Sequence, residues 1–181
     1  MTILIIFAVA LLVAGVLLYN RLVRARNRVD TAWSDIDVQL QRRHDLIPNL
    51  VKAVKQYADY ERATLEAVTA LRDEAKNIDD VEKLGELEEE LSAGVRKLIA
   101  VAEDYPDLKA NENFLGLQAE LAQTEDYLQF ARRYYNGSVR DYNTMTETVP
   151  SNMIAGFFGF EARKFFQKAS DHVANAPLVK L

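Results

Sequence analysis

The first twenty residues carry no charged side chain, and this run constrains the fold more than any other part of the sequence. The run "MTILIIFAVALLVAGVLLYN" is apolar almost throughout, and about 20 such residues allow a helix to cross the hydrocarbon core of a bilayer. A secretory signal peptide would need a basic start and a small-residue cleavage site after its apolar core, whereas Ala8-Val9-Ala10 lies in the middle of the run. We therefore expect residues 1–20 to form a retained transmembrane anchor.

Four arginines flank this run on its carboxyl-terminal side, and no basic residue precedes it. The positive-inside rule places the arginines and the body in the cytoplasm, with the amino terminus outside. Setting the topology is the simplest role of these side chains, and a specific site for anionic lipid is the alternative. The membrane-flanking candidates are Arg21, Arg24, Arg26 and Arg28.

The composition excludes several classes of function. The chain has no cysteine, so disulfides and thiolate metal sites are excluded. The formal net charge is −5, and all of it belongs to the part beyond residue 20. Nucleic-acid affinity comes largely from Lys and Arg that neutralise phosphates, so we expect no nucleic-acid partner for an acidic body.

The rest of the chain shows helical periodicity, without the alternation typical of strands. Apolar residues three or four apart form four stripes, near residues 29–40, 50–71, 84–102 and 117–145. Short connections between amphipathic helices favour antiparallel neighbours. We therefore expect an all-α fold, in which the transmembrane helix precedes an antiparallel up-and-down four-helix bundle over residues 21–148.

Capping residues predict the helix boundaries. Asp79 and Asp80 suit the start of the third helix. Asp104 can cap the next one, with Pro106 in its first turn, and the fourth helix is predicted from about residue 108 to 146.

The stretch "QRRHDLIPNLV", residues 41–51, has two interpretations. A corner between the first two helices would use Asp45 as an N-cap and tolerate Pro48 in a first turn. Arg42 and Arg43 would then lie in the last turn of the preceding helix, where cations suit the helix dipole. We favour the corner, and a kinked continuous helix is the alternative.

Residues 149–181 form an aromatic-rich, short helical segment and a tail. Alternating helix directions return the end of the fourth helix to the membrane side. The phenylalanines there can pack against the bundle or the first helix, insert at the lipid boundary with Arg163, Lys164 and Lys168 at headgroups, or contact another subunit. The candidate interface consists of Phe157, Phe158, Phe160, Phe165 and Phe166.

No pattern for catalysis or metal binding stands out. A carboxylate-bridged metal site in a bundle needs Glu-x-x-His, but Gln41 and Ala169 precede His44 and His172 by three residues. Asp171 and His172 are adjacent and would diverge on a helix, so we read them as surface. We expect a non-enzymatic protein with no catalytic residue, cofactor or metal.

Two further patterns have mainly structural interpretations. The acidic run "ELEEE", residues 86–90, is read as a solvated face, with a docking patch as the alternative. Tyr135 and Tyr142 fit the core stripe of the last helix. Asn136 and Asn143, seven residues apart, share a face and can form interhelical hydrogen bonds.

Several motifs together resemble the LemA family. They are "YNRLVRARNRVDTAWSDIDVQLQRRHDLIPNLV", "YPDLKANENFLGLQAELAQTED", "FARRYYNGSVRDYN" and "VPSNMIAGFFGF", within residues 19–166. "DYLQ" at residues 126–129 departs from the pattern. The resemblance implies a single-pass protein of the bacterial inner (cytoplasmic) membrane with an outward amino terminus and a helical-bundle body. It implies no catalytic residues.

Two functions remain open at this point. The first is a scaffold that forms a homo-oligomer on the lipid bilayer and organises or shapes it. The second is an adaptor for a membrane protease or an envelope-stress system, which the resemblance suggests and which would use the acidic face near residues 86–90. An enzyme is the least supported alternative.

Overall fold

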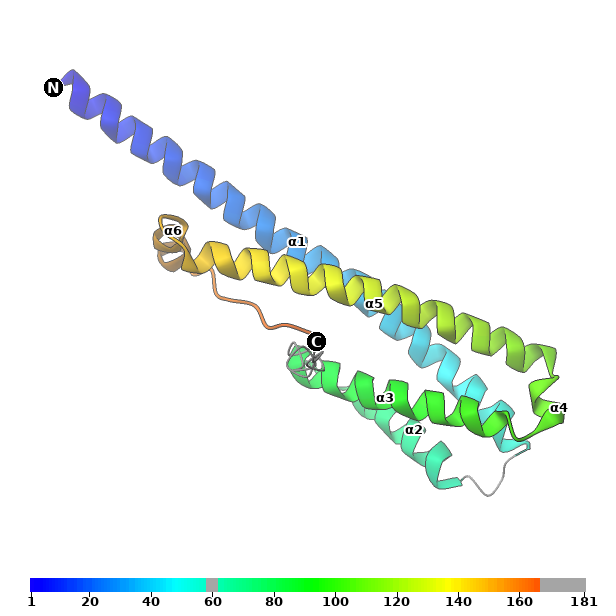
Figure 1. Ribbon diagram of the computed structural model, residues 1–181. Coiled ribbons are helices and arrows are strands. Elements are labelled where there is room, and N and C mark those ends of the chain that lie inside the picture. Colours follow the sequence, from blue (N-terminus) through cyan, green and yellow to red (C-terminus); the bar gives the residue numbers. More distant parts are fainter. Residues whose placement is uncertain (58–61, 167–181) are drawn as a thin grey trace, which may run out of the picture. The chain divides into compact units, whose positions relative to one another are not determined.

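The computed structural model describes residues 1–57 and 62–166, and this part of the chain contains helices and no strand (Figure 1). The prediction of an all-α fold is thereby confirmed. The residues group into two compact units, Met1–Val38 with Leu128–Lys164 and Gln39–Tyr127 with Phe165–Leu181. The domain boundaries expected at residues 20 and 148 stay predictions. The helices are α1 (Thr2–Lys55), α2 (Arg62–Ala75), α3 (Val81–Ala102), α4 (Pro106–Lys109), α5 (Glu112–Glu147) and α6 (Ser151–Phe158).

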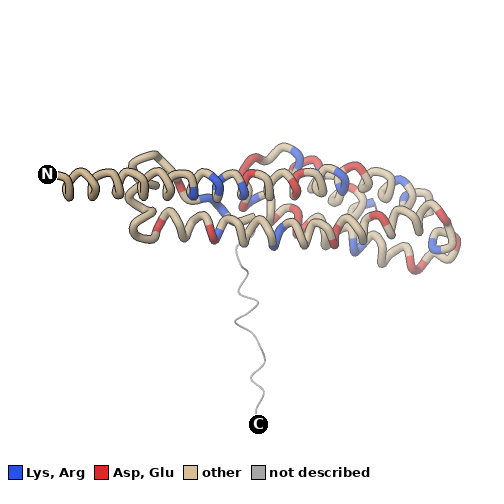
Figure 2. Tube along the Cα trace, turned by 90° about the horizontal axis from the view of Figure 1, so that it is seen from above, with Lys and Arg blue, Asp and Glu red and all other residues tan. Residues whose placement is uncertain are grey.

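The helix α1 has 54 residues and contains the apolar run from Thr2 onward. Its most apolar window has none of its residues buried, and its length and composition make it a candidate membrane span. Figure 2 shows that no charged residue interrupts the amino-terminal part. After the run, Leu22, Val29 and Ile36 are buried at intervals of seven residues. This heptad spacing is typical of helices that pack along a shared seam.

The predicted corner at residues 41–51 is wrong, because α1 continues through Pro48 to Lys55. Proline lacks an N–H, so the carbonyl oxygen of His44, four residues earlier, has no partner within the helix. The Nε of Arg72 on α2 donates to this oxygen at 2.7 Å. The hydrogen bond from a neighbouring helix compensates the break in the backbone ladder, and the alternative of a continuous helix holds.

The second unit is a helical bundle around one apolar core. Gly94 on α3 allows a close approach to α2, since a Cβ built on it would lie 2.8 Å from Val68 Cγ2. Residues of α1, α2, α3, α4 and α5 share this core: Ile47, Leu50, Val54, Leu65, Val68, Leu91, Val95, Leu98, Ala102, Leu108, Phe114 and Leu121.

One of the predicted helix caps agrees with the structure and two do not. Asp80 caps α3 by accepting from the backbone N–H groups of Glu82 and Lys83. The predicted start of the second helix at Asp45 is wrong, because the next helix after α1, α2, begins at Arg62. Asp104 does not cap, because α4 begins at Pro106 without a side-chain cap. This single turn is separate from α5, which is capped instead by the side chain of Asn111.

In the first unit, the carboxyl-terminal half of α5 packs on α1. The rings of Trp33 and Tyr135 lie 5.4 Å apart between their centroids. Tyr135 and Tyr142 are both buried, which confirms their predicted place in the core stripe. Burial also raises the pKa of both tyrosines above the usual value.

Candidate functional site

The short helix α6 begins where α5 ends, within an uncharged stretch between Glu147 and Glu161. The Ser151 hydroxyl donates to the Thr148 carbonyl at the start of α6. Gly159 ends the helix in the left-handed conformation with φ 70°, which glycine adopts without steric cost. The N–H of Phe160 then donates to the Ala155 carbonyl, so hydrogen bonds define both ends of this short helix.

One face of α6 is apolar and uncovered. Met153 is 72% exposed and Phe157 is 83% exposed, whereas Ser151 and Ala155 on the other face are buried. Phe158 is also exposed, at 54%. Large apolar side chains in such a cluster are typical of a surface that contacts lipid or protein.

The buried side of α6 packs against the apolar part of α1. The Tyr19 ring lies 4.7 Å from the Phe158 ring and 5.7 Å from the Phe160 ring between centroids. Further toward the amino terminus, a Cβ built on Gly15 would lie 3.9 Å from Cδ1 of Ile154. The helix α6 therefore lies beside residues 15–19 of the candidate span, in the same unit.

The chain after α6 is fastened to both long helices. The Asn143 side chain donates to the Arg163 carbonyl at 2.9 Å and accepts from its N–H at 2.8 Å. The Tyr135 hydroxyl donates to the Lys164 carbonyl at 2.9 Å, and the Arg163 guanidinium pairs with Asp30 at 3.2 Å. These bonds hold the position of α6. The interhelical hydrogen bond predicted for Asn143 is not the one found, because its partner Arg163 lies in the non-helical chain after α6.

The candidate phenylalanines fall into two groups. Phe157, Phe158 and Phe165 are exposed, whereas Phe160 and Phe166 are buried. Packing against the first helix therefore accounts for Phe160, and the surface role is left to the exposed members. Lys168 lies outside the described residues.

The four flanking arginines have different surroundings. The Arg26 guanidinium lies over the Phe160 ring, 5.3 Å from its centroid, in a cation–π arrangement. The other three, Arg21, Arg24 and Arg28, line a pocket between α1 and α5. Their predicted role in setting topology stays a prediction.

A second cluster of polar residues lies inside the second unit. Glu88 on α3 is fully buried, and its carboxylate contacts Arg43 Nη1 at 3.1 Å and His44 Nε2 at 2.6 Å. The other Arg43 nitrogen donates to the Ser92 hydroxyl at 2.7 Å. Because all three side chains are buried and Glu88 pairs with both Arg43 and His44, the arrangement favours a structural role over catalysis.

The solvated reading of the acidic run is wrong at Glu88, while Glu86, Glu89 and Glu90 are exposed as expected. Glu88 follows Leu84 by four residues and precedes Leu91 by three, so the helical spacing could have identified it as inward-facing. His172 and Asp171 lie outside the described residues. Within residues 1–57 and 62–166, no group of three or more Asp, Glu or His side chains is placed to hold a metal ion.

Comparisons with known proteins identify relatives of the chain. The sequence model of the LemA family matches residues 32–181. The chain is 30% identical over 138 residues to Protein LemA of Metamycoplasma hominis, an alignment that covers 75% of this chain and 63% of that protein. It is 24% identical over 194 residues to Magnetosome protein MamQ 2 of Paramagnetospirillum magneticum, covering 93% of this chain and 71% of the relative. Magnetosome protein MamQ of Magnetospirillum gryphiswaldense is 23% identical, with coverage of 88% and 68%.

Proposed function

The chain belongs to the LemA family, and on this premise we propose that it is a non-enzymatic, membrane-anchored scaffold that self-associates and shapes the bilayer. The apolar part of α1 spans the bacterial inner membrane with the amino terminus outside. The helical body lies in the cytoplasm, on the side of the four arginines. The exposed face of α6 inserts into the cytoplasmic leaflet.

The observation that carries this proposal is the position of α6 beside the apolar run. Tyr19 precedes Arg21 by two residues and Gly15 precedes it by six. At 1.5 Å per residue, α6 lies about 3–9 Å on the apolar side of the first arginine. Interfacial helices bury their apolar faces about 5–10 Å deep, so the depth of α6 matches that of an inserted segment.

Insertion into one leaflet has a mechanical consequence. A helix with large side chains such as Phe157 and Met153 adds volume to the cytoplasmic leaflet only. Many copies held together by self-association would expand that leaflet locally and bend the bilayer. The relatives named as magnetosome proteins support an association of this family with a membrane compartment.

The insertion of α6 can be measured with a single tryptophan. In full-length protein reconstituted in vesicles, Trp33→Phe removes the native indole and Phe157→Trp adds one on α6. We expect blue-shifted emission and quenching by lipids brominated on their acyl chains. The matched control is Phe130→Trp, because Phe130 is 62% exposed on α5 and lies outside α6. Emission from an aqueous environment at position 157, equal to that of the control, would exclude insertion.

Self-association and membrane shaping are tested by two separate measurements. Light scattering with the detergent contribution subtracted should give a discrete assembly for the full-length protein. Electron microscopy of vesicles should show tubules or buds with the wild type and fewer with Phe157→Ser. A monomer at membrane-like concentration, together with unchanged vesicles, would argue for the second function.

That second function is an adaptor for a membrane protease or another quality-control protein. Three exposed carboxylates on α3, Glu86, Glu89 and Glu90, favour it because they offer an acidic docking face. A photo-crosslinker at position 89 should then capture a membrane partner, with position 100, which is exposed but eleven residues further along α3, as control. Equal capture from both positions would remove this support.

A further inference from the structure

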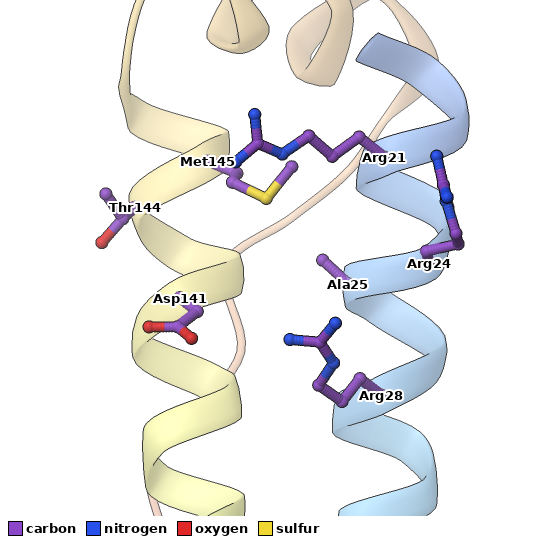
Figure 3. A pocket seen from close by; sticks show the side chains of 7 residues that line it. All are labelled: Arg21, Arg24, Ala25, Arg28, Asp141, Thr144 and Met145. Carbon is purple, nitrogen blue, oxygen red and sulfur yellow. The ribbon is translucent and has the colours of Figure 1, made fainter. Parts of the chain in front are cut away.

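A pocket of about 530 Å³ opens between α1 and the carboxyl-terminal half of α5, within the first unit. Figure 3 shows that the side chains of Arg21 and Arg28 extend from α1 toward α5. Arg24 lies on the outer side of α1, where its Nε donates to the Asn20 carbonyl at 3.2 Å. Three of the four flanking arginines therefore contribute to the lining of one pocket, and two of them, Arg21 and Arg28, extend across it, which topology alone does not require.

The charge around this pocket is not balanced. Its lining has three arginines and one carboxylate, that of Asp141. Within residues 1–57 and 62–166, neither Arg21 nor Arg28 has an ion-pair partner, in contrast to Arg163, which pairs with Asp30. Asp141 lies across from Arg28 in Figure 3. Among the described residues no other carboxylate lines the pocket, so the charge of Arg21, which is nearer to the apolar run, is not balanced. An anion between the two guanidinium groups would relieve their repulsion.

We propose that this pocket binds the phosphate group of an anionic lipid headgroup. Arg21 directly follows the apolar run, and Arg28 lies seven residues further, or about 10 Å along the helix. The headgroup layer on one side of a bilayer is about 5–8 Å thick, so these side chains cover the depth at which lipid phosphates lie. The planar guanidinium matches phosphate oxygens with paired hydrogen bonds. The inference rests on the membrane attachment proposed above.

The lipid preference of the pocket can be measured in an assay that does not depend on membrane bending. Full-length protein in a neutral detergent is mixed with phosphatidylglycerol and phosphatidylcholine of the same acyl chains, and retained lipid is counted by native mass spectrometry. We expect phosphatidylglycerol to be retained about tenfold over phosphatidylcholine, because both lipids carry the phosphate but the choline ammonium of the second is repelled by the arginines. The double variant Arg21→Gln/Arg28→Gln should abolish the preference, and Arg21→Lys/Arg28→Lys should keep part of it.

The matched control is Arg26→Gln, which removes one charge from the same turns of α1 but lies on Phe160 outside the pocket. An unchanged preference in this variant supports the site. Equal retention of both lipids by the wild type, or an equal loss of preference with Arg26→Gln and Arg21→Gln, would overturn the proposal in favour of diffuse charge.

Competition with inorganic phosphate distinguishes a lipid headgroup from a soluble ligand. If inorganic phosphate displaces the bound lipid only at high salt concentration, the ligand is a headgroup. Phosphate that binds at micromolar concentration without lipid preference would assign the same pocket to a soluble phosphate and overturn the lipid source. Because the assay uses micelles, a failure of vesicle bending would leave its result intact.

Discussion

Replacing Pro48 by alanine tests how α1 continues through a proline. A proline inside a helix is about 3 kcal/mol less favourable than alanine, in part because one carbonyl loses its partner. Here Arg72 supplies that partner at 2.7 Å from the His44 oxygen. A hydrogen bond from a charged donor contributes about 1.5–3 kcal/mol, so Pro48→Ala should stabilise the protein by no more than about 1.5 kcal/mol.

The same geometry predicts how two substitutions combine. In the wild type, Arg72→Ala leaves the His44 carbonyl without a partner and should destabilise by about 2 kcal/mol. After Pro48→Ala, the new N–H at position 48 can donate to this carbonyl. Arg72→Ala should then cost less than about 1 kcal/mol, because the His44 carbonyl keeps a partner and the change removes only the weak exposed ion pair with Asp73 at 2.8 Å. The expected coupling energy is about 1–1.5 kcal/mol.

The assay is urea unfolding of full-length protein in non-ionic micelles, followed by circular dichroism at 222 nm and linear extrapolation. Pro106→Ala is the control, because Pro106 begins α4 and its missing N–H interrupts no ladder. That change should destabilise by less than about 1 kcal/mol through the unfolded state. If Arg72→Ala costs the same in both backgrounds within about 0.5 kcal/mol, the compensation argument fails.

Three further predictions concern other contacts. Glu88→Ala should destabilise by about 2–4 kcal/mol in the same urea assay, because it removes the fully buried partner of Arg43 and leaves only the partly exposed Glu125 at 3.6 Å. The double change Arg43→Met/Glu88→Met should cost less. Burial raises the pKa of Tyr135, so only the unfolded chain loses this proton just above pH 10.0. The free energy of unfolding should therefore fall as the pH rises past that value, and less steeply with Tyr135→Phe. Asn143→Ala removes both bonds to the Arg163 backbone and should speed hydrogen exchange at the Arg163 amide at least tenfold, whereas no change would mean that the segment is held elsewhere.

Much of the fold follows from periodicity that can be read along the chain. The apolar run, the stripe through Val29 and Ile36 and the spacing of Tyr135 and Tyr142 each depend on residues within a few turns of one another. Local patterns of this kind specify which face of a helix is buried. The all-helical class and the inward faces were therefore predictable.

The errors arose where a distant residue decides the outcome. Pro48 predicts a break, but Arg72 from another helix supplies the lost bond. Glu88 belongs to an acidic run that suggests solvent, yet Arg43 and His44 compensate its burial. The place of α6 beside Gly15 depends on the path of the whole chain. The sequence therefore indicated an aromatic segment, but not its position along the apolar run of α1.

Under the proposed membrane insertion, the continuity of α1 gives bilayer thickness a role in this protein. One uninterrupted helix carries both the apolar run and the residues on which α6 packs, Gly15 and Tyr19. A run of this length spans about 30 Å, and a thinner bilayer is accommodated by helix tilt. Tilting such a rod changes the depth of whatever is fixed to its side. On the function proposed above, membranes of different thickness would hold α6 at different depths and would be bent to different extents.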